Sequence, residues 1–237
     1  MSRADELRRL HRAPPLLVLP NAWDVASAKA FAALPGCRAL ATTSAGVARS
    51  LGWEDGERAP VEEMLQVVER IAAAVAIPVT ADLEAGYGDP PRTAAAALAA
   101  GAAGMNLEDS QGEAELVSLE AQLEIIRAVR AAAPEIVLNA RVDVFLAGDG
   151  ILDEAVERGN AYLEAGADCV YPILAPFESI GELARRIGGP VNVLAPVAAP
   201  RLDELERLGV TRVTFGSGLA GAALAEAGRL AGEALAR

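Results

Sequence analysis

The sequence holds little of the side-chain chemistry on which many enzymes depend. Of its 21 lysine and arginine residues one is a lysine, Lys29, and the single histidine is His11. A Schiff-base mechanism would have to use Lys29, which lies in a helical stretch near the N-terminus. A serine triad or a histidine-bound zinc would have to use His11, which precedes the first predicted strand. Surface or packing roles suit both residues better, so we expect catalysis to rest on carboxylates, arginine, hydroxyls and backbone amides.

Cysteine, long apolar runs and positive charge are also scarce. Cys37 and Cys169 are the two cysteines, and neither has the spacing of a metal or redox site, which predicts a reduced, cytoplasmic protein. The longest apolar runs are alanine-rich and broken by charges and glycines, and residues 1–6 lack the apolar core of a signal peptide, so we expect no membrane partner. The net charge of -12 repels polyanions and argues against nucleic acid as a partner.

Strand-like and helix-like segments alternate along the chain. The predicted strands are residues 16–20, 39–44, 79–84, 104–109, 136–143, 169–174, 191–195 and 212–217. The predicted helices are residues 24–33, 60–75, 90–100, 118–133, 152–165, 177–187, 201–208 and 219–236. Eight such units in 237 residues favour an α/β fold, a (β/α)8 TIM-type barrel that forms a single domain over residues 1–237. An open, doubly wound sheet is the alternative, although it rarely needs so many evenly spaced units.

Proline and glycine punctuate these segments in alternation. A proline closely precedes every odd-numbered predicted strand, and a glycine that ends a helix precedes every even-numbered one. The prolines are Pro15, Pro78, Pro134 and Pro190, and the glycines are Gly36, Gly101, Gly166 and Gly209. Proline cannot continue a helix and glycine readily adopts the left-handed cap, so this punctuation indicates a βαβα unit repeated four times.

Two carboxylates follow an apolar strand in the stretch VTADLEAGYGD, residues 79–89. Side chains alternate along a strand, so Asp82 and Glu84 are expected to face the same side. The active site of such a barrel lies at the carboxyl ends of its strands, where Glu108 would join from the next strand. Like charges about 5 Å apart cost several kcal/mol even at an effective dielectric near ~20. These groups are therefore either protonated or hold a hard cation, Mg²⁺ first and Mn²⁺ second.

Within that site, Asp82 is the best direct metal ligand, and Glu84 and Glu108 come next, through water. Arg141, in LNARVD, ends a predicted strand beside them. An arginine in this position suits two-pronged capture of a substrate carboxylate. A salt bridge from Arg141 to Asp143 or Glu108 is the alternative.

Five segments together resemble the isocitrate lyase/phosphoenolpyruvate mutase superfamily. They are NAWDVASAKAF (21–31), TTSAGVARSLGWEDG (42–56), ADLEAGYGD (81–89), GMNLEDS (104–110) and NARVD (139–143). The resemblance implies a Mg²⁺-dependent barrel enzyme that handles 2-oxo acid enolates. It also implies a homodimer or homotetramer that exchanges its last helix between subunits.

The same resemblance assigns roles to individual residues. Asp82 matches the metal aspartate, and Glu84 and Glu108 match its water-mediated partners. Asp55 matches a gating or metal-shell aspartate. The segment Thr43, Ser44 and Ala45 matches the one whose amides and hydroxyl hold the enolate oxygen and the carboxylate, and Trp23, Arg141 and Asn192 match substrate-pocket positions.

The chain departs from the family in one loop. Family lyases follow the Glu-Asp pair with a basic Lys-[Lys/Arg]-Cys-Gly-His-type loop whose cysteine is the acid/base, and the mutases place a lysine and an asparagine there. Here residues 109–115 read DSQGEAE, and no lysine or arginine occurs between Arg92 and Arg127. Tyr87, Glu108 and the 110–115 loop remain as candidates for proton transfer.

These observations predict a Mg²⁺-dependent carbon–carbon lyase that acts on a small 2-hydroxy or 2-oxo (di)carboxylate through an enolate. Arg141, Glu108, Asp55 and Tyr87 are its candidate catalytic residues. An oxaloacetate hydrolase or decarboxylase needs the same enolate site, and a phosphoenolpyruvate mutase-like enzyme is disfavoured because a phosphonate dianion would meet the acidic loop. A 2-oxo-acid-binding protein that has lost turnover is the alternative outside the enzymes.

Overall fold

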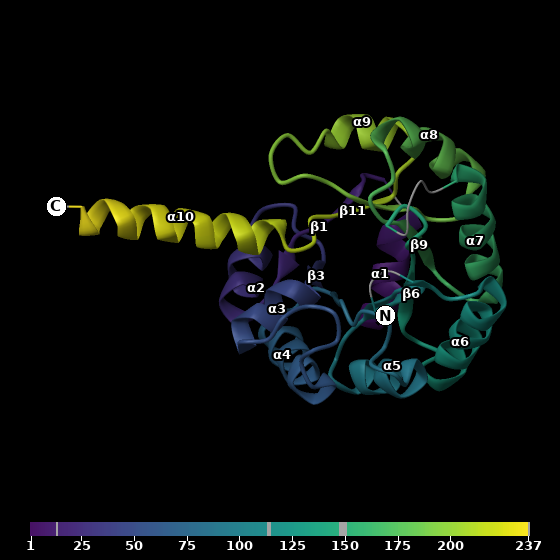
Figure 1. Cartoon of the computed structure of the whole chain (residues 1–237), viewed down its shortest axis with the longest axis horizontal. Helices are drawn as coiled ribbons and strands as arrows, with labels where there is room; N and C mark the ends of the chain where they lie inside the picture. Colours follow the sequence, from purple (N-terminus) through teal and green to yellow (C-terminus); the bar gives the residue numbers. More distant parts are fainter. Residues whose placement is uncertain (13, 113–114, 147–150, 237) are drawn as a thin grey trace.

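Parallel strands alternate with helices in the computed structural model, which describes residues 1–12, 14–112, 115–146 and 151–236 (Figure 1). The strands are β1 (Leu17–Leu19), β2 (Asn21–Ala22), β3 (Leu40–Thr42), β4 (Val79–Ala81), β5 (Gly104–Leu107), β6 (Ser110–Gln111), β7 (Glu115–Leu116), β8 (Val137–Val142), β9 (Cys169–Pro172), β10 (Asn192–Leu194) and β11 (Arg212–Thr214). The helices are α1 (Arg3–Arg12), α2 (Val25–Ala32), α3 (Ser44–Leu51), α4 (Val61–Ala74), α5 (Pro90–Ala99), α6 (Leu119–Ala132), α7 (Leu152–Ala165), α8 (Phe177–Arg186), α9 (Leu202–Arg207) and α10 (Gly218–Leu235).

The strands close into a barrel. One parallel sheet has the order β2-β3-β4-β5-β8-β9 and the other β1-β11-β10. A parallel bridge between Val170 and Val191 joins β9 to the start of the second sheet. On the other side, β1 and β2 are the two halves of one strand interrupted at Pro20, which has no N–H to donate to a ladder. The predicted (β/α)8 barrel is confirmed, although its first strand, predicted at residues 16–20, forms β1 at Leu17–Leu19 and continues beyond Pro20 as β2.

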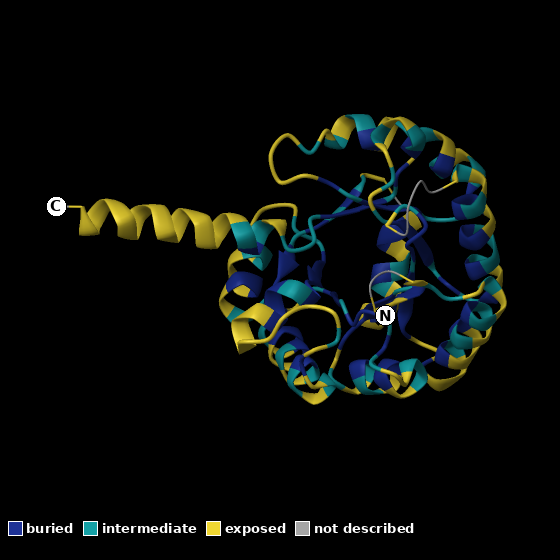
Figure 2. Cartoon of the chain, in the orientation of Figure 1, coloured by how far each residue is buried: buried dark blue, intermediate teal, exposed yellow. Residues whose placement is uncertain are grey.

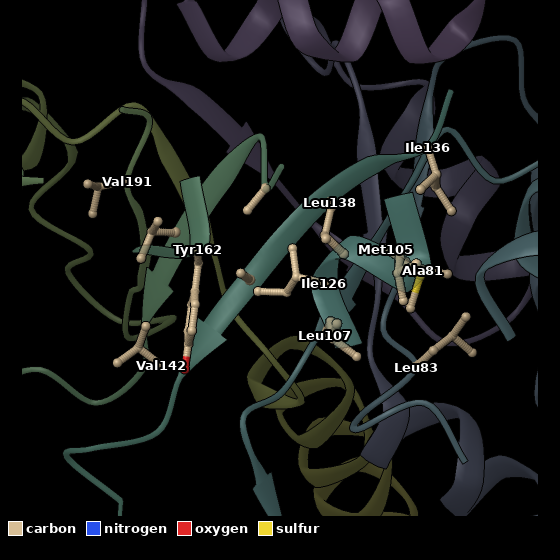
Figure 3. Close-up of a cluster of buried hydrophobic side chains, with 14 of the residues drawn as sticks. Ala81, Leu83, Met105, Leu107, Ile126, Ile136, Leu138, Val142, Tyr162 and Val191 are labelled. Carbon is tan, nitrogen blue, oxygen red and sulfur yellow. The ribbon is translucent and has the colours of Figure 1, made fainter. Parts of the chain in front are cut away.

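The outward faces of the strands form most of the core. Leu83, which follows β4, packs in one buried cluster with Met105, Leu107 and Leu138 of β5 and β8, and Tyr162 of α7 joins this cluster from the helix side (Figure 3). Burial follows the same geometry, with buried residues on the inner helix faces and exposed residues outside (Figure 2). Ordinary strand–helix packing therefore holds the wall of the barrel, which leaves its inward positions for other side chains.

Helix α1, which the sequence analysis did not predict, lies across the centre of the ring (Figure 1). Leu7 and Leu10 are fully buried and belong to a cluster with Leu17 and Leu19 of β1. Arg8 Nε donates to Asp168 Oδ1 at 2.9 Å and fastens the helix to the turn before β9. The helix thus closes the N-terminal end of the barrel, so the other end is the open one.

Two further elements were missed. Helix α3 begins directly after β3, where a strand alone was expected, and a short antiparallel hairpin pairs β6 with β7. By contrast, all four predicted helix-ending glycines have positive φ, as in Gly166 (φ 118), the left-handed C-cap of α7.

Helix α10 projects away from the barrel and is exposed along nearly its whole length (Figures 1 and 2). Ala220, in its first turn, is buried, whereas Leu224, Leu230 and Leu235 are exposed. In the part of the chain that the structure describes, no helix is both long and apolar enough to cross a membrane.

Candidate active site

Asp82 lies directly after β4 and is held on both carboxylate oxygens. Its Oδ2 accepts from the Ser44 backbone N–H at 3.0 Å, and its Oδ1 accepts from Asn106 Nδ2 at 3.0 Å. Its own backbone N–H donates to Thr42 Oγ1 at 2.8 Å. Groups on α3 and β5 thus fix the rotation of this carboxylate at the open end of the barrel, and Thr42 of β3 holds its backbone.

Glu84 also lies in this region, but strand alternation, which the sequence predicted, does not set the direction of its side chain. The strand ends at Ala81, and Glu84 has φ 51, so a left-handed turn and not strand alternation sets its direction. Its Oε1 accepts from the Tyr87 hydroxyl at 2.7 Å, and its Oε2 accepts from the Glu57 N–H at 2.8 Å. Glu57 Oε1 in turn accepts from the Tyr87 N–H at 2.6 Å. Glu57, which the sequence analysis missed, therefore joins the loop after α3 to the loop after β4.

Arg141 is enclosed by two carboxylates. Its Nε donates to Asp143 Oδ1 at 2.5 Å and its Nη2 to Asp143 Oδ2 at 2.6 Å, while Nη1 donates to Glu108. Asp143 also accepts from the Ser110 hydroxyl. The salt bridges considered as the alternative for Arg141 are thus present. They still leave one N–H on each terminal nitrogen, because a guanidinium carries five.

Burial shifts the acid–base behaviour of the site. Burial raises the pKa of Glu84 to about 7, against the Tyr87 hydrogen bond, with Asp55 adding to the rise. Burial likewise raises the pKa of Glu108; Arg141 opposes the rise, and Asp82 and Asp143 add to it. The pKa of Tyr87 is raised by burial and by the Glu84 charge, so this hydroxyl stays protonated. Burial therefore favours the neutral forms of Glu84 and Glu108, and a nearby cation would oppose this effect.

The N-terminus of α3 points at Asp82. Thr43 is its N-cap, with Oγ1 accepting from the Gly46 N–H at 3.3 Å, and the Ser44 N–H is taken by Asp82. The Ala45 N–H has no acceptor among the described residues. Among the backbone N–H groups of the predicted segment 43–45, that of Ala45 is thus the one open to a developing oxyanion, and the helix dipole favours negative charge there.

Three other residues predicted for the site, Asp55, Trp23 and Asn192, are not among those that line the cavity or bind Asp82. Asp55 is on the loop after α3, where burial and the Asp82 charge raise its pKa and a hydrogen bond with Ser44 lowers it. The Trp23 and Phe31 rings meet edge to face with centroids 6.1 Å apart. Asn192 begins β10 instead of ending it, is fully buried, and donates to Thr214 Oγ1 at 3.3 Å. A direct substrate contact was expected of Asn192, and this position inside the barrel gives no support for one.

A cavity of about 510 Å³ opens beside these groups, within the range of small-molecule sites. Glu57, Glu84, Glu108 and Arg141 are its charged lining residues among those described, and Ser110, Gln111 and Gln122 add neutral polar groups. Neither cysteine is in this lining: Cys169 is fully buried in β9 and Cys37 lies before β3. Glu113 and Ala114, part of the predicted acidic loop, lie outside the described residues.

The donor chemistry fits a hard cation. Asp82, Glu84, Glu108 and Asp55 offer oxygen alone, and a dication would stabilise the charged form of carboxyls whose pKa burial raises. As they stand, no three acidic, histidine or cysteine side chains of the described residues are close enough together to enclose a metal ion directly. A cation here would therefore have few direct protein ligands, and the assignment of Asp82 as the direct ligand, with Glu84 and Glu108 acting through water, stays a prediction.

A closed parallel barrel with an acidic cavity at the carboxyl ends of its strands is the architecture of TIM-barrel enzymes. A model of the phosphoenolpyruvate phosphomutase family matches residues 7–235. The chain belongs to this family and so to the isocitrate lyase/phosphoenolpyruvate mutase superfamily, which confirms the resemblance found in its motifs.

Individual relatives show the same kinship. A 2-methylisocitrate lyase of Bacillus subtilis is 31% identical over 230 residues, covering 90% of this chain and 75% of the relative. A Burkholderia cenocepacia protein provisionally assigned as a phosphonomutase superimposes with a TM-score of 0.92 at 38% identity, covering 97% of this chain and 98% of its own. An oxaloacetate acetylhydrolase with bound oxalate has a TM-score of 0.85 at 28% identity, covering 94% and 83%. Lyases, mutases and hydrolases thus share this fold.

Proposed function

We propose that this protein is a Mg²⁺-dependent carbon–carbon lyase for a small 2-hydroxy or 2-oxo (di)carboxylate. The observation that carries the proposal is the position of Asp82. Its carboxylate is fixed by Ser44 and Asn106 beside an arginine and two further carboxylates, at the open end of a barrel whose relatives include 2-methylisocitrate lyases. Mn²⁺ is the second choice of metal, because it accepts the same oxygen ligands.

The residues divide the work of cleavage. Asp82 would hold the cation, which supplies a positive charge that polarises the oxygens at one end of the substrate. Arg141 would bind a carboxylate through the N–H groups that Asp143 and Glu108 leave unused. Ala45 would donate its N–H to the oxygen on which charge collects when the carbon–carbon bond breaks.

Cleavage of the carbon–carbon bond also requires two proton transfers. A base removes the proton of the substrate hydroxyl, its C–O bond becomes a carbonyl, and the electron pair of the broken bond stays on the other fragment until an acid protonates it. Glu108 contacts Arg141 at the cavity and is placed to exchange a proton. Tyr87, whose hydroxyl donates to Glu84 and whose pKa is raised, suits orienting Glu84 better than acting as a base.

Charge in the cavity limits the substrate. One substrate carboxylate can meet the cation and a second can meet Arg141. A third would meet no further basic group among the described lining residues, and residues 113–114 and 147–150 contain no lysine or arginine either. Small dicarboxylates are therefore favoured over tricarboxylates.

The cation site is tested by titrating Mn²⁺ into wild type and Asp82→Asn in a calorimeter. We expect the variant to lose most of its affinity, because an amide oxygen carries no charge. Asp153→Asn removes an exposed carboxylate on α7 that pairs with Arg186, and serves as the matched control. Unchanged Mn²⁺ affinity in Asp82→Asn would refute the proposed function.

Cleavage or hydrolysis of oxaloacetate is a second candidate, supported by the structural likeness to oxaloacetate acetylhydrolase. A panel of 2-oxo acids and malates, with products followed by NMR, separates the two activities. Binding of these acids with no product from any of them would instead favour a 2-oxo-acid-binding protein.

A further inference from the structure

Arg212 is an arginine buried inside the barrel without an acidic partner. It is fully buried at the start of β11, where the side chain reaches the barrel interior. Its terminal nitrogens lie 3.4 Å from His11 Nε2 and 3.4 Å from Asn106 Oδ1. No salt bridge joins it to any described residue, and its Nε has no partner among them. Burying a charge in this way is costly, so the position calls for an explanation beyond packing.

The polarity of the hydrogen bonds around Arg212 is fixed. His11 Nδ1 lies 2.8 Å from the Leu7 carbonyl oxygen, which can only accept, so the ring proton is on Nδ1 and Nε2 is an acceptor. His11 stays neutral, because burial, and then Arg212, lowers its pKa to about 3. Arg212 has donors alone and can therefore bond to His11 on one side and to the Asn106 oxygen on the other.

The same polarity carries through Asn106 to Asp82. Asn106 Oδ1 accepts from Arg212 and, at 2.8 Å, from Asn139 Nδ2. The NH₂ group of Asn106 therefore faces the other way and donates to Asp82 Oδ1 at 3.0 Å. Two neighbouring amides can reverse together, and Asn139 Oδ1 has no partner among the described residues to prevent it. Neither end of the relay can reverse, because Arg212 only donates and an ionised Asp82 only accepts, so both favour the orientation in which Asn106 turns its oxygen to Arg212 and its NH₂ to Asp82.

We propose that Arg212 is a positioning residue that acts through Asn106 to hold the carboxylate of Asp82 in its working orientation. The inference rests on the proposed function, in which Asp82 is the metal ligand. Without Arg212, the Asn106 oxygen keeps one donor, Asn139, and its NH₂ is held toward Asp82 less firmly. One of the two donors that fix the carboxylate is then less well oriented, the other being the Ser44 N–H.

The first test is the Mn²⁺ affinity of Arg212→Met, measured by calorimetry. A positioning role predicts binding weaker by roughly tenfold, the scale of one hydrogen bond to a charged group. Simple loss of a positive charge would tighten the binding of a dication, and a purely structural role would leave it unchanged. Either of these results overturns the proposal. Arg130→Met is the matched control, since Arg130 binds Asp168 and the Gly166 carbonyl, outside the relay.

The second test needs no metal. In the side-chain amide NMR spectrum of the metal-free protein, the Asn106 NH₂ signals should shift on Asp82→Asn in an otherwise wild-type chain, and this shift should be measurably smaller when Arg212→Met is also present. A shift of undiminished size overturns the relay. If wild type fails to bind Mn²⁺, the proposed function fails, and this readout still decides the role of Arg212.

Two further variants cover the case in which Arg212→Met does not fold. Arg212→Lys keeps the charge and loses the second arm of the fork, so its Mn²⁺ affinity should also fall. Asn106→Leu should weaken Mn²⁺ binding to a similar degree, and combining the two should add little. Independent, additive effects would show that Arg212 does not act through Asn106.

Discussion

Asp143 holds Arg141 with both of its carboxylate oxygens from only two residues away along the chain. Strand β8 ends at Val142, so the two side chains leave the strand end on the same side and meet at once. The guanidinium plane is therefore set before any ligand arrives, with its unused N–H groups at the cavity. Such preorganisation lowers the entropy lost on binding.

Replacing Arg141 by lysine should abolish this geometry. An ammonium is a point charge and cannot bond Asp143, Glu108 and a ligand carboxylate in one plane. We expect Arg141→Lys to bind pyruvate or oxaloacetate about 10- to 100-fold more weakly in calorimetry with Mn²⁺ present. Arg186→Lys, at an exposed ion pair with Asp153, is the control. Wild-type affinity in Arg141→Lys would show that the carboxylate binds elsewhere.

Tricarboxylates should be poor substrates. Residues 109–115, where the family resemblance places an acid/base cysteine, contain none, and general acid–base assistance is worth roughly 10²–10⁴ in rate. Isocitrate and 2-methylisocitrate should therefore be cleaved slowly or not at all in steady-state assays. A kcat/KM above about 10⁴ M⁻¹s⁻¹, within the ordinary range of enzymes, would show that the loop supplies proton transfer by other means.

The charge limit can be tested by adding a cation at the cavity. Gln111 is exposed on β6 and lines the cavity, so Gln111→Arg should strengthen the binding of isocitrate relative to that of pyruvate. The gain should fall with added salt, because an exposed charge is screened. Gln111→Leu controls for loss of the amide. Equal changes for both ligands would contradict an electrostatic limit.

Assembly should depend on α10. Its leucines face solvent along a helix that leaves the barrel (Figure 2). The helix therefore carries more apolar surface than a single stripe facing the core requires. We propose that a second copy of the chain covers this surface in a homodimer or homotetramer. Light scattering at micromolar concentration should give at least a dimer for wild type and a smaller species for Leu224→Asp/Leu230→Asp. A wild-type monomer would contradict the proposal.

Acid should weaken the fold through His11. Burial, and then Arg212, lowers its pKa to about 3 in the folded chain, whereas the ordinary value is 6.5, so the unfolded chain binds this proton first. The stabilisation is present above pH 6.5 and is lost as the pH falls toward 3. Its slope approaches about 1.4 kcal/mol per pH unit.

Urea unfolding of wild type and His11→Gln between about pH 4 and 7.5 measures this contribution. The difference between the two free energies of unfolding should shrink as the pH falls, because wild type loses the His11 contribution and glutamine does not titrate. The carboxyl groups titrate in both proteins and cancel in the difference. A difference that is constant with pH would mean that His11 binds its proton equally well in the folded and the unfolded chain.

Much of the site was readable from the chain because its residues sit at positions that barrel topology brings together. Asp82 and Glu108 follow apolar strands, Arg141 is the last residue but one of β8, and parallel strands in a barrel all end at one rim. Glycine and proline fixed the strand–helix boundaries for local reasons of backbone geometry, as Gly166 illustrates. Glu57 carries no comparable signal, since its role depends on two loops meeting 27 residues apart.

Sequence alone therefore determined the barrel, the family and the acidic rim, because periodicity, punctuation and motif order are local properties of the chain. Only the tertiary structure decided how the charges pair. In the folded chain Arg141 pairs with Asp143 and Glu108, and Asn192 is buried inside the barrel. Arg212 contacts Asn106, which in turn binds Asp82. His11 and Arg212 are 201 residues apart, and no spacing rule connects them. They meet because α1 closes the barrel against its last strand, and a buried hydrogen-bond donor takes whichever acceptor that closure brings within reach.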